Sequence, residues 1–133
     1  MTAPLAQRQA EVVRCLVAGG PVPEGFDPSR LESTRKALLR KRSGEVARAW
    51  PELAASYGDK WHETFAAWAD GKPPLGSQID GYDFAIEHPP TAAAAVELMV
   101  YEVGRRKPPA FRYRHGVLVI NISGKVRVFG RVN

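Results

Sequence analysis

The segment FRYRHGVLVINISGKVRVFGRV, residues 111–132, carries the strand signal of this chain. It contains the β-branched run 117–120, and Ser123-Gly124 fits a two-residue turn. This pattern predicts one β-hairpin in which Val119 faces Val128 and Asn121 faces Val126. An isolated hairpin is at best marginally stable in water. We therefore expect it to pack on a helix or to pair with another chain.

Alternation along the hairpin gives it two faces. One face is expected to be apolar and to consist of Tyr113, Val117, Val119, Val126, Val128 and Val132. The other mixes Leu118, Ile120 and Phe129 with Lys125, Arg127 and Arg131. We expect the apolar face to cover the last predicted helix at Leu98, Met99 or Val103, and one strand edge to remain open.

The preceding residues predict a series of helices separated by glycine and proline. Thr2 and Asp59 are expected to cap helices, and Asp27-Pro28 to begin one. Ser43-Gly44 is expected to weaken the helix that contains it. A short helix is predicted over 79–86, and an apolar last helix from Thr91 to about Val103. Trp61, Phe65 and Trp68 should share one buried face. The predicted fold class is α+β, an N-terminal helical bundle with a small C-terminal β-hairpin. Residues 1–88 and 89–133 are its expected divisions, packed as one compact unit.

Composition narrows the class of protein without selecting a partner. The 133 residues suffice for one compact core, and the net charge is +5. Such an excess attracts nucleic acid, anionic lipid or an acidic protein. No apolar run approaches the roughly 20 residues of a membrane span, the N-terminus lacks a secretory signal, and the single Cys15 has no partner for an internal disulfide. These features favour a cytoplasmic location without membrane attachment.

The sequence offers no clustered chemistry. His62, His88 and His115 are scattered, Cys15 fits a buried inert thiol, and the carboxylates Asp80, Asp83 and Glu87 fit a solvated face. We therefore expect no catalytic residue, no metal site, no cofactor and no enzyme activity. The alternative site is a basic run, either a solvated helix face or an anion- and nucleic-acid-binding surface, formed by Arg35, Lys36, Arg40, Lys41 and Arg42.

An ordered series of short motifs resembles a known family. The series consists of Arg30-Leu31 followed by Arg35, Ala47-x-x-Trp50-Pro51-x-Leu53, Gly58-Asp59-x-Trp61-x-x-x-Phe65-x-x-Trp68, Pro73-Pro74 and Gly81-x-x-Phe84. It is similar to the N-terminal DNA-binding-like domain of bacterial accessory proteins that accompany multinuclear non-haem iron oxidative enzymes in modified-peptide pathways. The resemblance covers roughly residues 5–84. Thr34 stands where that family usually has tyrosine, and the family's C-terminal part is normally longer.

The resemblance implies a non-catalytic accessory subunit, a monomer alone or a heterodimer with its iron-dependent enzyme, that helps to present a precursor peptide. An open hairpin edge could take an extended peptide as an added strand. The residues expected to bind the peptide or partner are Val119, Lys125, Arg127, Phe129 and Arg131. Two alternatives stay open: a nucleic-acid-binding or regulatory protein that uses the basic run, and a structural homodimer that pairs hairpin to hairpin.

Overall fold

A computed structural model describes residues 4–133, so the predicted cap at Thr2 lies outside the described residues. The elements along the chain are α1 (Leu5–Ala18), α2 (Pro28–Ala49), α3 (Pro51–Tyr57), the 3₁₀ turn η1 (Gly58–Lys60), α4 (Trp61–Ala69), α5 (Ser77–Glu87), α6 (Ala92–Arg105), β1 (Ala110–Arg114), β2 (Val117–Ile122) and β3 (Lys125–Gly130). The fold is α+β, as predicted, with the sheet at the C-terminal end.

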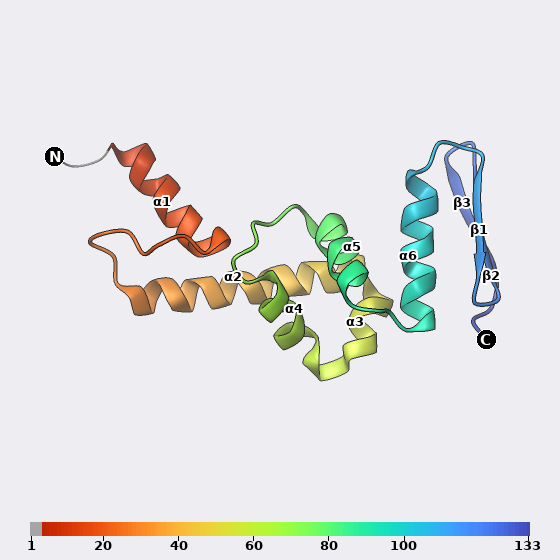
Figure 1. Cartoon of the computed structure of the whole chain (residues 1–133), viewed down its shortest axis with the longest axis horizontal. Coiled ribbons are helices and arrows are strands. Elements are labelled where there is room, and N and C mark those ends of the chain that lie inside the picture. The colour runs from red at the N-terminus through yellow and green to blue at the C-terminus, as the bar shows by residue number, and fades with distance from the viewer. Residues whose placement is uncertain (1–3) are drawn as a thin grey trace.

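The molecule is arranged around the long helix α2 (Figure 1). Helix α1 lies against one end of α2, and α3, α4 and α5 gather around the other end. Helix α6 packs on α3 on one side and on the sheet on the other, so it separates the helical body from the strands. The sheet therefore forms one end of the molecule.

Helix boundaries follow the capping residues in most places. The Asp27 carboxylate accepts a hydrogen bond from the Ser29 N–H at 2.9 Å, and the hydroxyl of Ser29 lowers the pKa of this carboxyl. Thr91 accepts a hydrogen bond from the Ala94 N–H at 3.4 Å and begins α6 as predicted. The prediction for Asp59 is wrong, because this residue lies within η1 and α4 has no side-chain cap.

The predicted weak point at Ser43-Gly44 is also wrong, since α2 continues unbroken to Ala49. Ser43 is fully buried, and its hydroxyl donates to the Arg40 carbonyl at 2.8 Å, which satisfies the hydroxyl without opening the helix. The indole N–H of Trp61 donates to the Ser43 carbonyl at 2.9 Å and ties α4 to this turn. Tertiary contacts thus override the low helix propensity of this dipeptide.

An aromatic core holds the helical body together. Trp61 and Phe65 are buried as predicted and contact Phe84 of α5, whereas Trp68 is half-buried at the rim of the same cluster. Trp50 is buried at the end of α2, and its indole N–H donates to the Gln78 carbonyl at 3.2 Å. Aromatic rings in tilted and edge-on contact contribute beyond their buried area. This core joins α2, α4 and α5.

The prediction of a lone hairpin is wrong, because the segment forms a three-stranded antiparallel sheet in the order β1-β2-β3. The Ser123-Gly124 turn is confirmed, and so is the register that pairs Val119 with Val128 and Asn121 with Val126. The missed element is a second tight turn at His115-Gly116, where both residues have positive φ, 52° and 80°. This is the geometry of a two-residue hairpin turn, and it folds residues 110–114 back along β2.

The extra turn changes one face assignment. Tyr113 pairs with Leu118, so it lies on the outer face and not with Val117 and Val119 as predicted. Val117 and Val119 are buried against Met99 and Val103 of α6, which confirms the expected packing. Leu98 instead joins the helical core. Val132 lies beyond β3, in the C-terminal tail.

Glu97 connects the sheet-bearing helix α6 to the helical body. Its carboxylate accepts hydrogen bonds from the N–H groups of Glu52 and Leu53, at 2.9 and 3.1 Å, in the first turn of α3. A negative charge is favourable at a helix N-terminus. Burial nevertheless raises the pKa of Glu97, and this effect outweighs the lowering by the two hydrogen bonds. Glu97 therefore fixes the position of α6, and with it that of the sheet.

Candidate functional site

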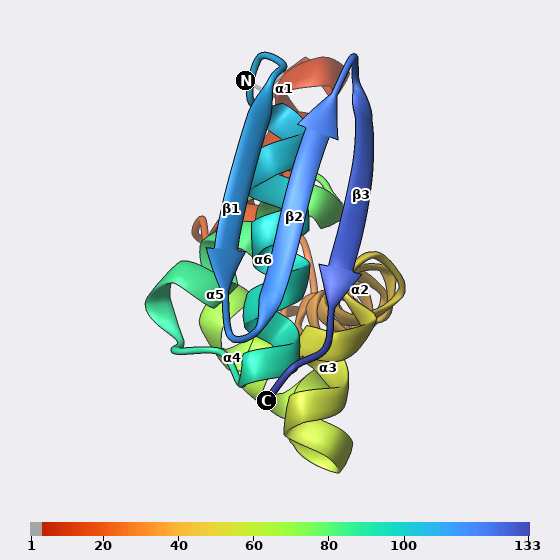
Figure 2. The ribbon, with the colours of Figure 1, turned by 90° about the vertical axis from the view of Figure 1, so that its right-hand side faces the viewer.

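The outer face of the sheet is uncovered within residues 4–133. Figure 2 looks onto this face, with α6 behind the three strands. Its exposed side chains include Phe111, 70% exposed, and Tyr113, 68% exposed. The contiguous apolar surface, which we call the outer face, is formed by Phe111, Tyr113, Leu118, Ile120, Ile122 and Phe129. Exposed apolar surfaces with a polar rim are typical of protein interaction sites.

A shallow groove runs over β2 and β3 on this face. It is lined by Ile120, Ile122, Ser123, Lys125, Arg127 and Phe129. Three of the predicted binding residues, Lys125, Arg127 and Phe129, therefore meet in one place. Arg131 is exposed just beyond the end of β3.

The prediction of Val119 as a binding residue needs correction. Its side chain is 0% exposed and packs on α6. It also lies on β2, which pairs with β1 on one side and β3 on the other. Neither its side chain nor an open strand edge is therefore available to a partner.

The open main chain lies on the outer strands, and β3 is exposed along all six residues. Ile122 and Lys125 flank the two-residue turn, which makes them a hydrogen-bonded pair. Alternation along the ladder then directs the N–H and C=O groups of Val126 and Val128 away from β2. These groups face the free edge of β3 and can accept an added strand.

Charge is divided unequally along the chain. Residues 103–133 contain no Asp or Glu and eight Lys or Arg, namely Arg105, Arg106, Lys107, Arg112, Arg114, Lys125, Arg127 and Arg131. The first 102 residues contain eleven Lys or Arg and fourteen Asp or Glu. The net positive charge of the protein therefore resides in the sheet and the end of α6. Such a surface attracts an acidic ligand.

The basic run on α2 does not form one free basic surface. Arg35 pairs with Glu32 at 2.6 Å and with Asp70 at 2.5 Å, and its hydrogen bond with Glu32 is the main cause that raises its pKa. Arg42 pairs with the buried Asp80 at 2.7 Å and donates to the Lys72 carbonyl at 2.6 Å.

Lys36, Arg40 and Lys41 are the exposed members of the run. Lys36 and Arg40 line a hollow beside α4, whereas Lys41 lines a different one, beside α1. Arg35 and Arg42 are therefore not available to a single anion-binding site, because both are engaged in ion pairs that hold elements of the fold together. The other residues of the run are divided between two surfaces.

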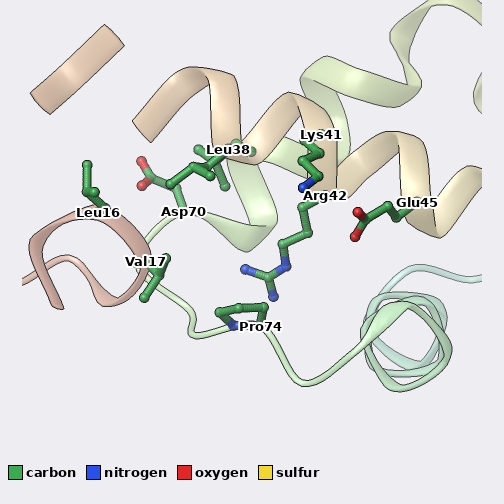
Figure 3. Close-up of a pocket in the computed structure, with 10 residues that line it drawn as sticks. Leu16, Val17, Leu38, Lys41, Arg42, Glu45, Asp70 and Pro74 are labelled. Atoms are coloured by element: carbon green, nitrogen blue, oxygen red, sulfur yellow. The ribbon is translucent and has the colours of Figure 1, made fainter. Parts of the chain in front are cut away.

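A small hollow lies between α1, α2 and the loop before α5 (Figure 3). Leu16, Val17 and Leu38 line it, and the Arg42 guanidinium lies beside Pro74 within it. Arg42 reaches from α2 to the carbonyls of this loop, so its role here is to hold the loop in place.

Metal-ligating side chains do not gather into a site within residues 4–133. No three His, Cys, Asp or Glu side chains gather there in a way that would hold a metal ion. Cys15 is buried, as predicted. His62 contacts the Ser43 hydroxyl at 2.5 Å, but Ser43 is 0% exposed and cannot meet a substrate.

A search of the described helices for a membrane span finds none that is both long and apolar enough.

The residues that carry the family resemblance are mainly structural. Trp50, Leu53, Trp61, Phe65 and Phe84 form the core. Gly81 lies against the indole ring of Trp50, where a Cβ would come within 2.2 Å of the ring. These motif residues thus build the helical body.

Fold and surface together define a small α+β protein whose C-terminal sheet leaves one face exposed. A family model described as "SCO6045-like, C-terminal domain" matches residues 6–89, so the chain belongs to this family. A protein of Streptomyces avermitilis described as "UPF0276 protein" is 44% identical over 85 residues, which are 63% of this chain and 17% of that protein. No solved structure matches the chain. The family match covers α1 to α5 and ends before α6 and the sheet.

Proposed function

We propose that this protein is a non-catalytic accessory subunit that binds a partner protein or peptide through its C-terminal sheet. The observation that carries the proposal is the open edge of β3, whose six residues are all exposed and lie in a segment, residues 103–133, that has eight Lys or Arg and no Asp or Glu. Main-chain pairing supplies affinity at such an edge, and the neighbouring side chains supply specificity. The ligand is an extended acidic segment that adds to the sheet as a fourth strand.

The family resemblance suggests the identity of the partner. By analogy with that family, the ligand is a precursor peptide, and the subunit docks on a multinuclear iron enzyme that modifies this peptide. The Streptomyces avermitilis relative supports association with a larger protein, because the matched segment makes up only 17% of that relative. The family description as a C-terminal domain agrees with such an arrangement.

The two alternative functions have weaker support. A nucleic-acid site on α2 would have to work without Arg35 and Arg42, which are engaged in ion pairs. A homodimer that pairs sheet to sheet would bring together two surfaces of the same strong positive charge, which repel each other. An acidic partner meets neither objection.

The proposal is tested with an iron-dependent enzyme and a precursor peptide, if genes neighbouring this one encode them. We expect the wild-type protein to co-purify with them and β3 to gain protection from hydrogen exchange in the complex. Val128→Pro removes an outward N–H and should prevent the complex while preserving the fold. Val22→Pro, at an exposed valine before α2, is the matched control. Unchanged protection of β3 on complex formation would refute the proposal, and an isolated locus without such an enzyme gene would contradict its finer form.

A further inference from the structure

Resting on the proposed function, we infer that the edge of β3 selects a particular pattern of ligand, an extended peptide in which apolar and acidic residues alternate. A strand added to β3 directs successive side chains to opposite sides of the sheet. The two sides of β3 differ in chemistry, so the added strand experiences two different rows of neighbours. The pattern of the ligand follows from these two rows.

The row on the α6 side is apolar and incomplete. It consists of Val126, 36% exposed, and Val128, 49% exposed, although both lie on the same face as the buried Val119. Gly104 of α6 lies beneath Val126, where a Cβ would come within 3.4 Å of the valine. Helix α6 therefore reaches under β3 but leaves its outer flank uncovered. Apolar side chains of an added strand would cover this flank.

The row on the outer side is basic and ends in an aromatic ring. Lys125 and Arg127 are two residues apart, so their cross-strand neighbours in the ligand are also two residues apart. Opposite charges are favourable at directly facing positions, which predicts acidic residues there. The neighbour of Phe129 should be apolar. Along Lys125 to Val128 the pattern therefore alternates between apolar residues toward α6 and acidic residues toward the outside.

The opposite edge of the sheet is less suited to this ligand. On β1 the corresponding position on the α6 side is Arg112, whose guanidinium bonds to Glu102. This ion pair places a polar group where β3 presents valine. The pattern therefore belongs to β3, where an apolar row and a basic row flank the same open main chain.

The test uses three short synthetic peptides with a fluorescent label. One alternates valine and glutamate, the second has the same composition with the valines and glutamates in separate blocks, and the third alternates valine and lysine. We expect the full-length protein to bind the first and to discriminate against the other two. In Lys125→Glu/Arg127→Glu the preference should reverse toward the lysine peptide. Each changed pair should shift the affinity by about two- to fivefold.

The matched control is Arg48→Glu/Lys60→Glu, which makes the same change of net charge at exposed residues of the helical body. It should leave the preference for glutamate intact. The inference is overturned if the block peptide binds as well as the alternating one, or if the control reverses the preference equally. A third outcome would also overturn the inference: an oligothymidylate displaces the peptide, and Phe111→Ser abolishes oligothymidylate binding. The outer face would then bind single-stranded nucleic acid. The comparison of the three peptides uses the wild-type protein, so it does not depend on the folding of a variant. If Val128→Pro prevents the complex but the peptides show no preference for alternation, this inference fails and the proposed function stands.

Discussion

Replacing Gly81 by alanine should destabilise the helical body, although alanine is the better helix former. Gly81 lies within α5, where alanine would contribute about 1 kcal/mol through helix propensity. Its Cβ, however, would come within 2.2 Å of Cδ1 and 2.3 Å of Nε1 of Trp50. Trp50 is 1% exposed and surrounded by the aromatic core, so the ring must move by about 1 Å against close-packed neighbours. Overpacking of this kind costs about 1–3 kcal/mol or more.

Gly44→Ala is the matched control, because a Cβ at Gly44 has open space around it and the residue lies within α2. We expect this variant to gain about 0.5–1 kcal/mol in free energy of unfolding. We expect Gly81→Ala to lose about 1–2 kcal/mol net, because overpacking against a rigid ring, about 3 kcal/mol at the upper end of its range, exceeds the gain of about 1 kcal/mol in helix propensity. Urea unfolding monitored by tryptophan fluorescence measures both. Equal effects of the two substitutions would show that Gly81 is not required for the packing of Trp50.

The remaining predictions concern the core, a buried ion pair and a titrating carboxylate. Trp68→Ala should cost no more than about 3 kcal/mol, the lower end for a core aromatic, because Trp68 is only half-buried; an unchanged melting temperature would contradict this. Arg42→Met should cost about 3–5 kcal/mol in urea unfolding, because it leaves the carboxylate of Asp80, 2% exposed, without its charge partner, whereas Lys41→Met should have little effect. Burial in the folded state raises the pKa of Glu97 above the ordinary 4.5. Just above pH 4.5 the folded protein therefore keeps the Glu97 proton, whereas the unfolded chain has lost it. The free energy of unfolding consequently falls as the pH rises through this interval. Glu97→Gln should remove this part of the slope, which urea unfolding across the interval measures; an unchanged slope would show that Glu97 does not cause it.

The helical body was predictable because its signals are local. Asp27 and Thr91 act through residues two or three positions away, and Trp61 and Phe65 share a face by helical spacing alone. The errors arise where distant contacts decide. The helix continues through Ser43 because the chain returns from α4 to satisfy that turn, which no local pattern reveals.

The grouping of side chains at the candidate surface was predictable in part for the same reason. Lys125, Arg127 and Phe129 alternate along one strand, so their common face follows from spacing. The turn at His115-Gly116 was the available signal for β1, since glycine readily adopts the positive φ that such a turn requires. Without that turn Tyr113 falls on the wrong face. The ion pairs of Arg35 and Arg42 join α2 to residues more than thirty positions later in the chain, beyond the reach of sequence patterns.

The charge distribution and the family match point to the same division of roles. The matched residues 6–89 contain the aromatic core, and their motifs are explained by packing. The positive charge and the open edge lie outside the match, in α6 and the sheet. A surface that only stabilised the helical body would be covered by it, yet only the α6 side of the sheet is covered. The other side presents Phe111 and Tyr113 to solvent on the same face as Lys125 and Arg127, an arrangement that is costly to leave exposed and favourable to cover with an acidic partner.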